Sequence, residues 1–113
     1  MNTYRLRPGY GSNELFIEIT SGAENEIFLF ELEKVLSPIK VEILGLKDLW
    51  NNDEMFFKAT CTLGTFEISI DDINYHAYIM VNENQNLIME IDTILNKSSL
   101  FEKEIVDFKK YEL

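Results

Sequence analysis

The middle of the chain constrains the fold most, because three successive runs alternate apolar and polar residues. The runs are Met55 to Leu63, Thr65 to Ile70 and Tyr75 to Val81. A period of two is typical of strands with one buried face, and Gly64 and the polar residues 71–74 are suited to the turns between them. The sequence therefore predicts an antiparallel meander.

The same patterns add strands and helices on either side. Further strands are predicted at Thr3 to Arg7, Glu14 to Thr20 and Ile39 to Leu44, with a connection from Gly45 to Asn52. Ser21 and Glu24 have capping-box spacing, which predicts a helix that ends before Pro38. Its apolar stripe is Phe28, Leu32, Val35 and Leu36.

A second helix is predicted from apolar residues at helical spacing, namely Leu87, Ile88, Ile91, Ile94 and Leu95. Ser99 and Glu102 repeat the capping spacing and favour a last helix, although Glu104 to Tyr111 is also compatible with a strand. These elements predict one α+β domain over residues 1–113. Its antiparallel sheet of five to six strands would carry two to three helices on one face.

Acidity limits the partners. The 113 residues include 20 acidic and 10 basic ones, a net charge of −10 with a pI near 4.4. Nucleic acid is disfavoured, because lysine and arginine supply most of the affinity for phosphate backbones. No apolar run is long enough to span a bilayer, and the single cysteine agrees with a reducing compartment, so a cytoplasmic location is expected.

Residues for catalysis or metal binding are few. Cys61 and His76 could pair across neighbouring strands, but a small buried thiol is the simpler interpretation. Asp71, Asp72, Asn74 and His76 match no calcium or zinc spacing, so a solvated turn is favoured over a metal site. We therefore expect no enzyme activity, cofactor or metal.

Candidate partner-binding residues are aromatic or acidic. Trp50 is followed by Asp53 and Glu54, a composition typical of a hot spot for a basic partner. Phe16 and Phe56 interrupt polar faces and are expected to form a second core face under a helix. Two stretches without a basic residue supply the remaining candidates, which are Glu24, Glu26, Glu31, Glu67, Asp71 and Asp72.

In size, acidity and its lone cysteine the chain resembles the bacterial immunity proteins of contact-dependent and polymorphic toxin systems. The acidic segments Glu24 to Glu33 and Asp71-Asp72 carry this resemblance. It implies one-to-one binding to a basic toxin domain, often a nuclease, with carboxylates replacing substrate phosphates. One alternative is a small enzyme or ligand-binding domain that uses His76 and a nearby aspartate in a pocket between sheet and helices. Another is a structural or assembly subunit, and the oligomeric state stays open.

Overall fold

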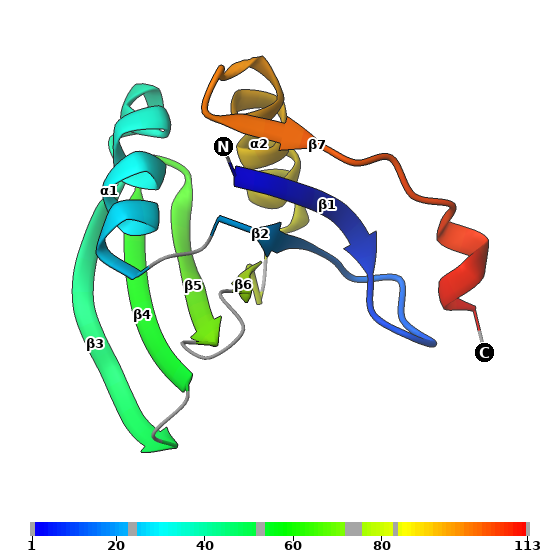
Figure 1. Cartoon of the computed structure of the whole chain (residues 1–113), viewed down its shortest axis with the longest axis horizontal. Helices are drawn as coiled ribbons and strands as arrows, with labels where there is room; N and C mark the ends of the chain where they lie inside the picture. Colours follow the sequence, from blue (N-terminus) through cyan, green and yellow to red (C-terminus); the bar gives the residue numbers. More distant parts are fainter. Residues whose placement is uncertain (1, 23–24, 52–53, 72–75, 83, 113) are drawn as a thin grey trace.

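The computed structural model describes residues 2–22, 25–51, 54–71, 76–82 and 84–112. Within these ranges seven strands form one mixed sheet in the order β3-β4-β5-β6-β2-β1-β7, and two α-helices pack on one of its faces (Figure 1). The strands are β1 (Asn2–Pro8), β2 (Leu15–Ser21), β3 (Glu42–Asn51), β4 (Glu54–Cys61), β5 (Gly64–Asp71), β6 (His76–Met80) and β7 (Phe101–Lys103). The helices are α1 (Asn25–Val35) and α2 (Gln85–Lys97), with short 3-10 turns at Ser37–Ile39 and Phe108–Tyr111. The predicted α+β class is confirmed.

The meander expected from the alternating runs is present and extends from β3 to β6. Ile68 pairs with Phe57 of β4 on one side and with Ile79 of β6 on the other. All three side chains are buried, so the apolar positions of neighbouring strands share one face. We call this the inner face, and the opposite one the outer face.

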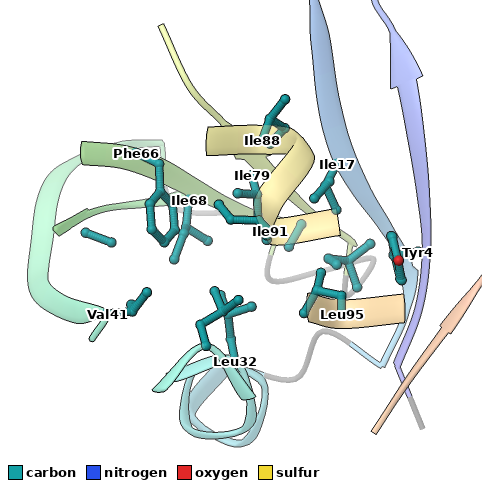
Figure 2. Close-up of a cluster of buried hydrophobic side chains, with 14 of the residues drawn as sticks. Tyr4, Ile17, Leu32, Val41, Phe66, Ile68, Ile79, Ile88, Ile91 and Leu95 are labelled. Atoms are coloured by element: carbon teal, nitrogen blue, oxygen red, sulfur yellow. The ribbon is translucent and has the colours of Figure 1, made fainter. Parts of the chain in front are cut away.

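Both helices cover the inner face (Figure 2). Helix α1 contributes Phe28 and Leu32, and α2 contributes Ile88, Ile91 and Leu95, to the same cluster of buried side chains as the strands. The start of α2 is fixed by Asn84, whose side chain accepts a hydrogen bond from the Asn86 amide. The space between sheet and helices is thus occupied by the core.

The predicted start of the first helix was wrong in one respect. Ser21 does not cap a helix, because it is the last residue of β2, and α1 begins at Asn25. Glu24, the other half of the proposed capping box, lies outside the described residues. The helical turns end as expected near Pro38, which lies in the 3-10 turn after α1.

The predicted connection from Gly45 to Asn52 was also wrong, since β3 continues to Asn51. The register between β3 and β4 shifts at three places, so β3 has more residues than the strand segment it faces. Each such bulge interrupts the alternation of apolar and polar positions. The strand therefore lacks the period-two pattern by which strands are recognised in sequence.

The predicted last helix is replaced by β7, which pairs in parallel with β1 and makes the sheet mixed rather than antiparallel. Phe101 is buried against Tyr4, with ring centroids 6.4 Å apart. Ile105, in contrast, is 82% exposed, and Phe108 is 44% exposed. Two of the three apolar residues whose spacing favoured a helix thus face solvent, and only Phe101 joins the core.

Candidate partner-binding site

One end of the sheet gathers several of the predicted binding residues. By register, the end of β3, the start of β4, the end of β5 and the start of β6 lie at the same end of the sheet. There Asn51 pairs with Glu54, Glu54 with Asp71, and Asp71 with His76, one residue from each of four neighbouring strands. We call these four residues the end row.

Two acidic residues of the end row, Glu54 and Asp71, occupy directly opposed positions on β4 and β5. Trp50 immediately precedes Asn51 on the edge strand β3, not in a connection as predicted. The fold therefore places one tryptophan and two acidic residues at neighbouring positions.

The other predicted residues are dispersed or not described. Asp53, Asp72 and Glu24 lie outside the described residues. Glu26 lies in the first turn of α1. Glu31 accepts a hydrogen bond from the Asn2 side chain at 3.3 Å, and Glu67 pairs in register with Lys58 partway along β5. Neither belongs to the end row.

The outer face carries an aromatic band, defined as Phe16, Phe56 and Tyr78. Phe56 pairs with Ser69 and Ser69 with Tyr78, and the Phe16 and Tyr78 rings lie 5.8 Å apart. Phe16 and Phe56 were expected to form a second core under a helix. That expectation was wrong, since both are half-buried and the two described α-helices pack on the inner face.

Arg7 forms a second outer-face cluster that the sequence did not reveal. Its guanidinium carbon lies 4.5 Å from the Phe16 ring centroid, 4.8 Å from that of Tyr111 and 5.6 Å from that of Tyr10. Its Nε donates to Glu18 at 3.1 Å. Residues from both ends of the chain meet here, and no local spacing pattern relates Arg7 to Tyr111.

Further ion pairs neutralise basic residues within the fold. Arg5 lies 3.2 Å from Glu104, and this hydrogen bond raises the arginine pKa despite the opposing effect of desolvation. Lys103 lies 3.0 Å from the buried Asp92 carboxylate, which also accepts from the Tyr4 hydroxyl at 2.9 Å. Burial raises the Tyr4 pKa, and the hydrogen bond and charge of Asp92 raise it further. Arg5 and Lys103 therefore form ion pairs within the folded chain.

The geometry separates the residues once considered for covalent catalysis. Cys61 pairs with Gly64 at one end of the β4–β5 hairpin, whereas His76 pairs with Asp71 at the other end. A surface pocket of about 450 Å³ lies near the Cys61 end, and polar residues in its lining include Lys58, Glu67, Asn82 and Asn84. Within the described residues, no group of three or more His, Cys, Asp or Glu side chains is arranged to hold a metal ion.

Comparisons with protein-family models, curated proteins and solved structures gave no match. None of the helices in the described ranges is long and apolar enough to cross a membrane.

Proposed function

We propose that this chain is a protein-binding module without catalytic activity, and specifically an immunity protein that neutralises a basic toxin domain. The observation that carries the proposal is the opposed pair Glu54 and Asp71 beside the strand that contains Trp50. Acidic residues at neighbouring register positions, close to a tryptophan, favour a basic partner through electrostatic complementarity.

The overall charge supports the same partner. A net charge of −10 creates a field that attracts basic proteins and raises association rates by roughly 10- to 1000-fold. Arg5, Arg7 and Lys103 contact Glu104, Glu18 and Asp92, so these three bases hold the fold together. A toxin that binds nucleic acid has the positive surface required to meet this field.

Co-expression tests the proposal. The toxin domain encoded beside the gene for this chain is expressed in a sensitive host, with and without the chain. We expect growth to be restored and a one-to-one complex to elute from a sizing column. Continued killing by the toxin, with no complex on the column, would contradict the proposal.

Charge-matched variants then locate the interface. Glu54→Lys with Asp71→Lys should abolish protection, because both carboxylates of the end row become cations facing a basic partner. Glu33→Lys with Glu90→Lys changes the net charge by the same amount at exposed helix positions and should preserve protection. Equal loss in both double variants would mean that general charge, rather than the end row, mediates binding.

A further inference from the structure

The chain continues after β7 as residues 104–112, which we call the C-terminal strap and which reach the β1–β2 turn (Figure 1). Within the described residues, the hydrogen bonds, ion pairs and ring contacts that join the strap to the rest of the chain lie at Glu104 and Tyr111. Glu104 accepts hydrogen bonds from Arg5 at 3.2 Å and from Thr20 at 3.0 Å. The strap is therefore held at two points, one near β7 and one near its far end.

Most residues between these two attachments face solvent. Ile105 is 82% exposed and Phe108 is 44% exposed. Asp107, Lys109 and Lys110 are exposed as well, and the Asp107 side chain accepts its hydrogen bond from the Lys109 amide within the strap. Segments that bury little apolar surface open at a lower free energy than the core of a protein. The middle of the strap therefore contributes little to keeping it on the sheet.

The far attachment combines one backbone hydrogen bond with one aromatic ring. The Gly11 amide donates to the Tyr111 carbonyl at 2.8 Å. The Tyr111 ring centroid lies 5.1 Å from that of Tyr10 and 4.8 Å from the guanidinium carbon of Arg7. Tyr10 and Gly11 are exposed and Tyr111 is half-buried, so this attachment can open without disturbing the core.

The attached strap encloses the side chain of Arg7, which is only 13% exposed. Tyr111 packs on the guanidinium from the strap, while Tyr10 and Phe16 contact it from the β1–β2 turn and from β2. Its Nε donates to Glu18 at 3.1 Å. If the strap leaves, Arg7 keeps Phe16 and Glu18 but loses the ring of Tyr111. The position of the strap therefore determines how much of the guanidinium faces solvent.

We infer that the C-terminal strap is a detachable cover that switches Arg7 between an enclosed and an exposed state. In the closed state Tyr111 packs on the guanidinium and accepts the Gly11 hydrogen bond. In the open state both contacts are broken, Glu104 stays in place, and the guanidinium faces solvent on the outer face. Opening does not require the sheet and helices to unfold. The inference is independent of the proposed function, because it concerns contacts within the chain.

Amide hydrogen exchange of the full chain, followed by NMR, measures the opening. The Gly11 amide should have a protection factor above that of an unprotected amide and roughly a hundredfold or more below those in the middle of α2. Tyr111→Ala keeps the backbone acceptor and removes the ring, so it should lower the Gly11 protection factor by roughly threefold to tenfold. Gly11 protection equal to that of α2, or no protection at all, would overturn the inference.

Arginine labelling gives a second measurement. Phenylglyoxal reacts with accessible guanidinium groups, and peptide mass spectrometry gives the rate at each arginine. Tyr111→Ala should speed the labelling of Arg7 by roughly threefold to tenfold. The labelling of Arg5 should stay unchanged, because its partner Glu104 belongs to the other attachment. Phe108→Ala is the matched control, since Phe108 lies in the same 3-10 turn and is not among the described rings that contact Arg7.

Unchanged labelling of Arg7 in Tyr111→Ala would overturn the inference. So would an equal increase in Phe108→Ala, because the effect would then not depend on the ring that covers the guanidinium. An equal increase at Arg5 would also overturn it, since the variant would have loosened the whole strap and β7. None of these measurements involves a toxin, so failure of the inference is distinct from failure of the proposed function.

Discussion

At the scale of single residues, the most consequential polar contact is the one among Tyr4, Asp92 and Lys103. Tyr4 is fully buried, and its hydroxyl lies 2.9 Å from the Asp92 carboxylate and 3.1 Å from the Asp92 backbone oxygen. Lys103 completes the cluster at 3.0 Å. A buried carboxylate is costly unless it is paired and hydrogen-bonded, and here both conditions are met. The contact joins β1, α2 and β7.

Tyr4→Phe removes one of these partners without changing the shape of the ring. We expect the free energy of unfolding at pH 7 to fall by about 1–2 kcal/mol, because the Asp92 carboxylate loses a donor in a buried site. Urea denaturation followed by circular dichroism measures this. Tyr10→Phe is the control, since Tyr10 is 66% exposed, and its loss should be much smaller. Equal losses would mean that the buried hydroxyl contributes nothing specific.

The raised pKa of Tyr4 makes the same comparison depend on pH. The unfolded chain releases the Tyr4 proton near the ordinary pKa of 10.0, whereas the folded protein retains it. The protonated Tyr4 hydroxyl contributes its full share to the free energy of unfolding below pH 10, and this contribution is lost as the pH rises above 10. The stability difference between the native protein and Tyr4→Phe should therefore narrow above pH 10. A difference that stays constant to pH 11 would contradict this assignment.

At the scale of elements, sequence patterns succeed where one strand or helix has a single regular buried face. The runs that became β4, β5 and β6 keep apolar residues at every second position, although Phe56 interrupts the opposite face of β4, and α2 has a continuous apolar stripe. The bulges of β3 break that alternation, so its second half was missed. β7 was missed because its formation depends on the free edge of β1, which is nearly 100 residues away in the chain.

The β4–β5 turn offers a test of backbone geometry. Gly64 has φ of 136°, a conformation that residues with a Cβ rarely adopt. A Cβ there would lie 3.9 Å from Leu87, an ordinary contact, so the expected cost is in the backbone rather than in crowding. Gly64→Ala should lower the free energy of unfolding by about 1–3 kcal/mol in urea denaturation.

Gly9→Ala is the matched control for this turn. Its added Cβ would meet Ser12 at 3.7 Å, again an ordinary contact, and Gly9 is not among the residues with positive φ. Gly9→Ala should leave the free energy of unfolding unchanged or raise it by about 0.4–1 kcal/mol, because alanine lowers the conformational entropy of the unfolded chain. Similar destabilisation at Gly9 and Gly64 would show that the positive φ is not the cause.

At the scale of the whole molecule, composition anticipated an acidic surface but not its arrangement. Trp50, Glu54 and Asp71 were individually suggested by their residue types, and only strand order and register bring them to one end of the sheet. The cluster around Arg7 had no counterpart in the sequence, because Tyr111 reaches it through a chain path that follows β7. Long-range pairing, rather than local pattern, determines both surfaces.

The excess charge itself predicts how stability responds to salt. The molecule measures 34 × 32 × 28 Å, and the screening length falls from about 30 Å in 0.01 M salt to about 10 Å in 0.1 M. Repulsion among the acidic residues therefore spans the folded protein at low salt and is largely screened at moderate salt. The partly buried pair of Lys103 and Asp92 is screened much less. The midpoint of urea unfolding should rise as sodium chloride increases from 10 to about 200 mM.

The double variant Glu33→Lys with Glu90→Lys makes this test specific. It lowers the magnitude of the net charge from 10 to 6 at exposed helix positions, each change removing one acid and adding one base. The variant has weaker repulsion among its acidic residues, and salt therefore has a smaller repulsion to screen. The salt-induced rise in the urea midpoint should be smaller in the variant than in the native protein. An unchanged rise would indicate that salt acts through apolar burial, while a fall in the native protein would mean that screened ion pairs outweigh the repulsion.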